Sequence, residues 1–209
     1  MHKEKGHRGS ADEEHMYTLT ELGEVLHEEH FRILVPICGL ENRITGKRAS
    51  EPLDPRNEDD RKLLEDLVFS LEQVIQHNVF EESVLFPLLC DHGETELAEL
   101  LVQEHVAIGP LARRLSGLAA ELLAHGTSAA RSNAFREVAQ DLVSEMLPHL
   151  QKEELSVVQR LDAFLDTETD HRLAHELAAA RAAGHHERPA SGHHSRAGAR
   201  PRASMPPVA

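Results

Sequence analysis

The sequence predicts an all-α protein, an antiparallel up-down-up-down four-helix bundle followed by a disordered C-terminal tail. Aromatic residues make up only 3% of the 209 residues and tryptophan is absent, so the core must consist mainly of Leu, Val, Ile and Ala. That composition favours helices over a β-sandwich. Four stretches repeat apolar residues at three- and four-residue spacing, which is the pattern of one buried helix face. Two short turns among the connections make sequential helices antiparallel neighbours.

The first two helices are expected on either side of a connector rich in Gly, Pro and Ser. The first should begin at Thr18, where "TLTE" has the form of a capping box with Glu21 in its fourth position. Its predicted buried face consists of Leu22, Leu26, His30, Ile33, Ile37 and Leu40. The second should run from about Asn57 to Leu89. Its predicted face consists of Leu63, Leu67, Ser70, Val74, His77, Glu81 and Val84.

The third and fourth helices are expected after the turn "CDHGET". The third should span Thr95 to His125 and stop at Gly126. Its predicted face consists of Ala98, Leu101, His105, Ile108, Ala112 and Leu115. The fourth should begin near Ser128, with Phe135, Ala139, Leu142, Met146, His149, Glu153 and Val157 in line. Pro110 and Pro148 fall inside these helices and are expected to kink them.

Composition divides the chain into three parts. Residues 1–16 are polar and predict a flexible N-terminus, and residues 17–168 hold the bundle. Residues 169–209 form a low-complexity tail rich in His, Arg and Pro. Within the tail, "HRLAHELAAARAAG" has the composition of a short helix, and the residues after it predict disorder. The tail histidines can bind metal weakly, or they are incidental residues of a basic linker.

Charge and cysteine content narrow the class of protein. The formal net charge of −14 argues against nucleic acid as a partner, because phosphate binding needs a basic face. Cys38 and Cys90 make neither a disulfide framework nor a CxxC motif, which predicts a cytoplasmic location. No run approaches the roughly 18 apolar residues of a membrane span, and the N-terminus lacks a signal-peptide core.

One motif occurs once in each half of the chain. "HNVFEE" at His77 to Glu82 is repeated as "HLQKEE" at His149 to Glu154. Each copy follows a Glu-His pair, in "EEH" ending at His30 and in "QEH" ending at His105. The spacing predicts two helical hairpins of similar size, each bringing one set of polar side chains into the bundle.

These polar residues are candidate metal ligands. His at position i and Glu at i+4 lie on one helix face, here the apolar one. At 1.5 Å per residue, His77 and His105 both lie roughly 16–18 Å from the turn between their helices, hence in one layer. The candidate ligands are His30, His77, Glu81, His105, His149 and Glu153.

The donor set decides which metals are expected. Two unpaired buried carboxylates would be strongly destabilising without a cation. Four imidazoles and two carboxylates suit iron, manganese or zinc better than Ca²⁺ or Mg²⁺, and bundles share two carboxylates between the metals of di-iron sites. The structural alternative is a plain bundle whose polar layer holds no metal.

The stretch from about Tyr17 to Asp166 resembles the hemerythrin-like, or HHE cation-binding, family, through "EEH", "HNVFEESVLFPLL", "QEH" and "HLQKEE". The resemblance implies a four-helix bundle with two non-haem iron ions, oxo- or hydroxo-bridged, with Zn or Mn as possible substitutes. It implies that Glu81 and Glu153 bridge the metals while the four histidines take terminal positions.

The pattern is more similar to the subgroup written H…HxxxE…H…HxxxE than to oxygen carriers. The carriers have a second His one turn before the one that matches His105, where this chain has Leu101. That subgroup includes proteins of iron–sulfur cluster repair under nitrosative stress and actinobacterial relatives that consume peroxide.

The resemblance implies a protein that reacts with O₂, hydrogen peroxide or NO, with a favoured role in peroxide degradation or in oxidative and nitrosative stress protection. A catalase-like or an NO- or O₂-reducing activity fits, and the electron donor stays open. The alternatives are a non-enzymatic sensor of O₂, redox state or iron, an iron-handling module, and a cluster-repair protein. Glu82 and Glu154 are expected at the bundle edge, beside the site or in solvent, and His27 in solvent.

Overall fold

The computed structural model describes residues 18–184, which are mostly helical and contain no strand. The all-α prediction is therefore confirmed for this part of the chain. The expected flexible N-terminus at residues 1–16 and the tail beyond residue 184 lie outside the described residues. The elements are α1 (Glu21–Thr45), α2 (Glu58–Phe80), a π-helical turn η1 (Glu81–Leu85), α3 (Phe86–Asp91), α4 (Thr95–His125), α5 (Ala129–Ser156), a 3-10 turn η2 (Val158–Arg160), α6 (Leu161–Phe164) and α7 (Thr167–Gly184).

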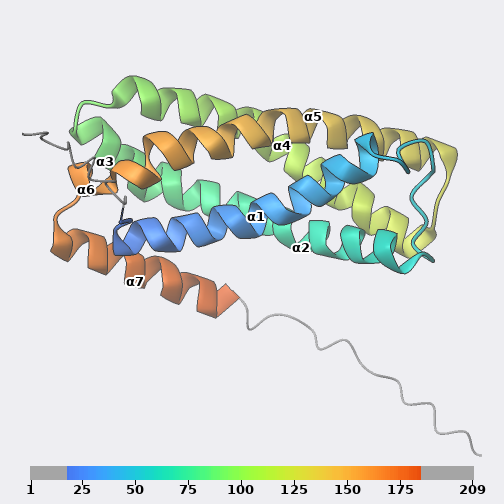
Figure 1. Cartoon of the computed structure of the whole chain (residues 1–209), viewed down its shortest axis with the longest axis horizontal. Helices are drawn as coiled ribbons and strands as arrows, with labels where there is room; N and C mark the ends of the chain where they lie inside the picture. Colours follow the sequence, from blue (N-terminus) through green and yellow to red (C-terminus); the bar gives the residue numbers. More distant parts are fainter. Residues whose placement is uncertain (1–17, 185–209) are drawn as a thin grey trace, which may run out of the picture.

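The four longest helices enclose a common core. α1 packs against α2, α2 against α4, α4 against α5, and α5 against α1, which closes a helical bundle (Figure 1). Within residues 18–184, none of the helices combines the length and the apolar character that crossing a bilayer requires.

Local signals set most of the helix ends. The Asn57 side chain accepts a hydrogen bond from the backbone N–H of Asp60 at 3.1 Å and begins α2. Ser128 caps α5 in the same way. Gly126 ends α4 with φ of +69°, a conformation that glycine adopts without strain. The predicted span of the third helix and the predicted start of the fourth are thus confirmed.

The predicted start of the first helix at Thr18 was wrong. α1 begins at Glu21, and Thr20 is its N-cap, accepting from the N–H of Gly23 at 3.1 Å. A tertiary contact adds to the cap: the Asp170 carboxylate accepts from the N–H groups of Glu21 and Leu22 at 2.9 and 3.3 Å. Thr20 is a local signal for this end that the prediction passed over, whereas the contact with Asp170, 148 residues or more away in sequence, could not be inferred from a local pattern.

The second predicted helix is interrupted, and part of its predicted face was wrong. Leu64 and Leu71 are fully buried, rather than the half-buried Leu63 and Ser70. The helix passes through the π-helical turn η1, which begins at Glu81. A π turn inserts an extra residue into the helix. Accordingly Leu85, not Val84, is the next fully buried apolar residue.

A layer of buried polar residues divides the core in two. One hydrophobic cluster fills the bundle between Ile33 of α1 and Met146 of α5. The other cluster packs Leu26 and Leu101 with the residues of α3, α6 and α7. Each of the four long helical stretches passes from one cluster to the other through its candidate ligands, so the polar layer is shielded from both ends of the bundle.

α7 is a fifth long helix that packs along α1 (Figure 1). Leu173, Ala174 and Leu177 are buried in the second cluster. The short helix suggested by "HRLAHELAAARAAG" is thus present, and it starts earlier, at Thr167. The structure extends the packed helical part beyond the boundary expected at residue 168.

Candidate metal centre

The six predicted ligands meet in the polar layer. Their exposed fractions range from 0% for Glu153 to 5% for His30, although all six are ionisable. Burial of that many ionisable groups is unfavourable unless each one is paired or binds a cation. They come from every long helix of the bundle: His30 from α1, His77 from α2, Glu81 from η1, His105 from α4, and His149 and Glu153 from α5.

The four imidazoles form two facing pairs. His30 Nε2 lies 3.1 Å from His77 Nε2, and His105 Nε2 lies 3.1 Å from His149 Nε2. The rings of each pair meet edge to face, with centroids 4.9 and 4.8 Å apart. Each pair joins two neighbouring helices and brings two ring nitrogens face to face.

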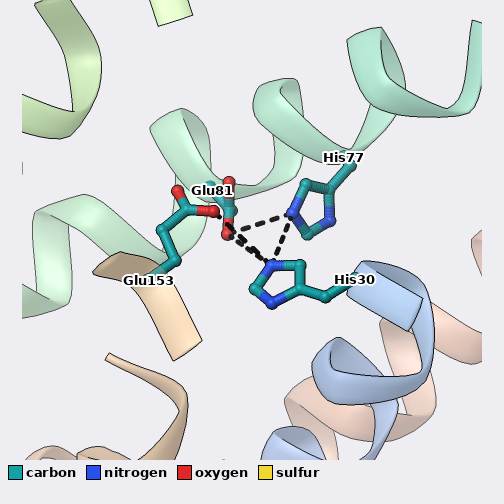
Figure 2. A group of neighbouring side chains, drawn as sticks. All are labelled: His30, His77, Glu81 and Glu153. Atoms are coloured by element: carbon teal, nitrogen blue, oxygen red, sulfur yellow. Dashed lines mark hydrogen bonds and ion pairs between the residues drawn. The ribbon is translucent and has the colours of Figure 1, made fainter. Parts of the chain in front are cut away.

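The Glu81 carboxylate lies between the two pairs. Its Oε1 is 3.3 Å from His77 Nε2, and its Oε2 is 3.5 Å from His105 Nε2. One oxygen therefore faces each pair, which is the geometry of a carboxylate that can be shared between two cations (Figure 2 shows the side facing His30 and His77).

The Glu153 carboxylate does the same from the opposite helix. Its Oε2 is 3.5 Å from His30 Nε2, and its Oε1 is 3.2 Å from His149 Nε2. The potential ligand atoms form two groups, and within each group all atoms lie within 4.8 Å of one another. Glu153 belongs to both groups. The first consists of His30, His77, Glu81 and Glu153, and the second of His105, His149 and Glu153.

Among the residues that the structure describes, three of the four inner carboxylate oxygens have no hydrogen-bond partner. They are Glu81 Oε2 and both oxygens of Glu153, and all three atoms are buried. A buried anionic oxygen without a donor is strongly unfavourable, so this layer requires a cation or protons. The donor chemistry of the six side chains fits a metal cation.

An outer ring of four glutamates orients the histidines. Each histidine Nδ1 lies within hydrogen-bond distance of a different glutamate carboxylate. The pairs are His30 with Glu154 at 3.0 Å, His77 with Glu29 at 2.7 Å, His105 with Glu82 at 2.9 Å, and His149 with Glu104 at 2.9 Å. Such partners fix the tautomer with the proton on Nδ1 and leave Nε2 free to bind a metal.

The sequence prediction covered only half of this ring. Glu82 and Glu154 lie at the edge beside the site, as expected, and His27 is exposed, with its Nδ1 2.6 Å from Glu154. Glu29 and Glu104 were missed, although each is the Glu of one of the two Glu-His pairs noted in the sequence. Both Glu-His pairs place the Glu one residue before a buried His, and that repeat was the available signal.

Opposing charges hold the carboxylates ionised. Burial alone would raise the pKa of Glu81, but the imidazoles of His77, His30 and His105 bring it below its usual value. The hydrogen bond from His30 is the main reason why the pKa of Glu154 is also low. Both carboxylates are therefore anionic acceptors at neutral pH.

The histidines of the site differ in their charge environment. Burial would lower the pKa of His77, yet Glu81 and Glu153 raise it above its ordinary value. At His149, burial together with the neighbouring His105 lowers the pKa. At His105, in contrast, burial would lower the pKa, but Glu153 and Glu81 raise it above the ordinary value. The two histidines of one pair thus lie in similar geometry and differ in electrostatics.

The fold and site define a helical bundle with a buried His/Glu cluster that can hold a metal cation. The chain belongs to the family described as the hemerythrin HHE cation-binding domain, whose model matches residues 12–161. No curated protein and no solved structure matches the chain. Members of this family bind metal cations, typically iron.

Proposed function

We propose that this protein is a hemerythrin-like di-iron protein that reacts with O₂, hydrogen peroxide or NO, with peroxide removal or stress protection as its role. The observation that carries the proposal is the pair of facing Nε2 atoms on each side of two shared carboxylates. If every Nδ1 proton points to an outer glutamate, no proton lies between the facing Nε2 atoms. A cation in each gap would remove the resulting repulsion.

The ligand assignment that we propose is symmetric. One position would take Nε2 of His30 and His77, and the other Nε2 of His105 and His149. Glu81 and Glu153 would each direct one carboxylate oxygen to the first position and the other oxygen to the second. Nitrogen and carboxylate donors in this mixture suit iron, and zinc or manganese as substitutes.

The proposed architecture is the antiparallel up-down-up-down four-helix bundle, with α7 added outside it. The support is the cyclic packing of α1, α2, α4 and α5 and the short connections on both sides of α4. Ferritin-like di-iron bundles likewise build their sites from inward-facing residues of adjacent helices.

Two features of the chain suit redox work on small molecules. With two histidines and one oxygen from each of Glu81 and Glu153, each metal would keep open coordination positions, as in other non-haem iron sites. A groove of about 630 Å³ leads to His77 and Glu29 and is lined by apolar side chains including Phe31, Val35 and Phe69. A small molecule in this groove would meet the site first at His77 and Glu29.

When bound, iron would supply redox and Lewis-acid chemistry. The chain's own residues would orient the ligands and shield the metal site from water. The outer glutamates hold the Nδ1 protons and orient the rings, and the two hydrophobic clusters exclude bulk water from both ends of the layer. Leu101, fully buried one turn before His105, supplies no further nitrogen ligand there.

Metal analysis together with an absorption spectrum of the full chain, purified without a histidine tag, tests the proposal. Two irons per chain and the near-ultraviolet absorption of an oxidised di-iron protein are expected. Rapid decomposition of added peroxide by the iron-loaded protein would support the enzymatic role. A metal-free chain that takes up no iron on reconstitution would refute it.

A non-enzymatic sensor is the second candidate. It is favoured by the contact between α7 and the site, where Arg181 binds Glu29. A metal-loaded protein that reacts with neither peroxide nor NO, and whose protease cleavage after α7 depends on bound metal, would favour this role over catalysis.

A further inference from the structure

The C-terminal helix reaches the candidate metal centre through one side chain. Arg181 of α7 forms an ion pair with Oε1 of Glu29, and it also donates to the carbonyl of Val25 at 3.3 Å. The other oxygen of Glu29, Oε2, lies 2.7 Å from His77 Nδ1. One carboxylate therefore links a cation on α7 to a histidine of the inner layer.

The other half of the bundle contains the same arrangement, built without α7. Lys152 of α5 forms an ion pair with Oε1 of Glu104, whose Oε2 lies 2.9 Å from His149 Nδ1. Lys152 is the third residue after His149 in "HLQKEE". The third residue after His77 in "HNVFEE" is Phe80, an apolar residue that packs in the second cluster. In this half the motif therefore carries no cation of its own at this position.

The environment of Arg181 is that of a structural cation. Its side chain is 15% exposed and that of Glu29 is 12% exposed, so water screens their attraction only weakly. Burial lowers the pKa of Arg181 to about 10, and the guanidinium therefore remains charged at neutral pH. The guanidinium fixes one oxygen of Glu29, which leaves the other directed at His77.

We propose that Arg181 is a positioning residue for the metal position formed by His30 and His77, and that it acts through Glu29. In this role α7 replaces the lysine missing from "HNVFEE", so one metal position depends on the C-terminal helix and the other does not. The inference rests on the proposed function, because it requires two metal positions. Partners of metal-binding histidines contribute about 10- to 100-fold to metal affinity.

The test is a Co²⁺ titration of the full-length, metal-free protein, followed by visible absorption in the presence of a weak chelator that masks loose surface binding. Wild type is expected to take two ions. Arg181→Gln should weaken one of the two by about 10- to 100-fold and leave the other within about twofold. Arg181→Lys keeps the charge, and Lys152 shows that a lysine can pair with the equivalent Glu104, so its loss should be smaller than that of Arg181→Gln. Arg172→Gln is the control, because Arg172 also lies on α7 and its ion pair is with Glu176 on the exposed surface.

A double-mutant cycle separates positioning from general packing. Glu29→Gln should reproduce the loss caused by Arg181→Gln, and the double variant should add less than about twofold to it, because both act on one contact. Glu29→Gln also leaves the apolar face of α7 intact. The contact from Arg181 through Glu29 to His77 therefore remains testable if Arg181→Gln does not fold.

Several results would overturn the inference. These are unchanged affinities in Arg181→Gln, equal weakening of both positions, identical effects of Gln and Lys, or additive losses in the cycle. If wild type itself takes no buried Co²⁺, the proposed function fails first. If wild type takes two ions and Arg181→Gln does the same with wild-type affinities, only the role of Arg181 fails.

Discussion

Glu153 and Glu154 are adjacent in α5, yet their carboxylates approach opposite nitrogens of the same imidazole. Glu153 Oε2 lies 3.5 Å from His30 Nε2, and Glu154 Oε2 lies 3.0 Å from His30 Nδ1. One of them faces the proposed metals and the other orients a ligand. The difference follows from helix geometry, because successive residues point about 100° apart.

Substitution of these two residues should therefore have unequal effects. Glu153→Ala removes oxygens from both proposed positions, and the iron content should fall from about two ions per chain to one or fewer. Glu154→Ala leaves all six ligands in place and should weaken affinity by about 10- to 100-fold. Metal analysis after dialysis against a chelator measures both, with Glu145→Ala on the exposed face of α5 as the control. Equal losses from the two variants would contradict the assignment.

The iron-loaded protein should not carry oxygen reversibly. Leu101 is fully buried where an oxygen carrier has a further histidine. The reduced protein is expected to oxidise in air and to stay oxidised after the oxygen is pumped away. Absorption spectra recorded through repeated cycles of air and vacuum check this. Leu101→His is the matching gain-of-function variant, although a polar group at this core position is costly. Full spectral recovery of the wild type in each cycle would show the expectation to be wrong.

The buried ion pair between Arg43 and Asp60 should make stability depend on pH. Arg43 Nε donates to Asp60 Oδ1 at 2.8 Å, and the two side chains are 8% and 1% exposed. Burial would raise the pKa of Asp60, but Arg43, Arg48 and the N–H of Asp54 bring it below its ordinary value. A depressed pKa means that the stabilisation is complete above the unfolded-state pKa and is lost as the pH falls through the folded-state pKa.

Asp60→Asn should thus lower the free energy of unfolding by about 3 kcal/mol at pH 7. The difference from wild type should shrink as the pH falls below about 4, where the unfolded carboxylate is protonated. Urea denaturation at both pH values measures it, and exposed Asp59→Asn is the neighbouring control. A difference that stays constant across this range would rule out the proposed linkage.

The cap that α7 provides for α1 should also be measurable. Replacing Asp170 with Ala removes the acceptor for the N–H groups of Glu21 and Leu22 and should cost about 1 kcal/mol. Asp170→Asn keeps an acceptor and should cost less. Thermal unfolding gives the stability, and faster amide exchange at Glu21 and Leu22 would locate the effect. Exposed Asp162→Ala serves as the control, and unchanged exchange in Asp170→Ala would be evidence against the cap.

The sequence was most informative where helical periodicity and chemistry coincide. All predicted face residues of α1, α4 and α5 are buried, including the four ligand positions on those helices, because polar ligands within an apolar stripe keep its spacing. The stripe was less clear in α2, where Leu63 and Leu64 compete for the core and where the π turn at Glu81 changes the spacing. A short-range sequence pattern cannot decide which of the two leucines is buried, and it cannot locate the π turn.

Long-range contacts account for the rest of what was missed. Nothing near Thr20 indicates that Asp170 caps the same helix, and nothing near Glu29 indicates Arg181. The composition of residues 169–184 is rich in Ala, His and Arg, which hides the three buried side chains Leu173, Ala174 and Leu177. These features depend on where α7 packs, which only tertiary structure defines.

The contacts between outer glutamates and histidines form a closed circuit around the bundle. Glu29 of α1 binds a histidine of α2, Glu82 after α2 binds one of α4, Glu104 of α4 binds one of α5, and Glu154 of α5 binds His30 of α1. Every helix thus takes part in two contacts, one through its glutamate and one through its histidine. Sliding any helix by one turn, or rotating it about its axis, would break both at once and leave buried polar groups unpaired. The circuit therefore specifies the register of the four helices, a task that two clusters of interchangeable leucines could not perform alone.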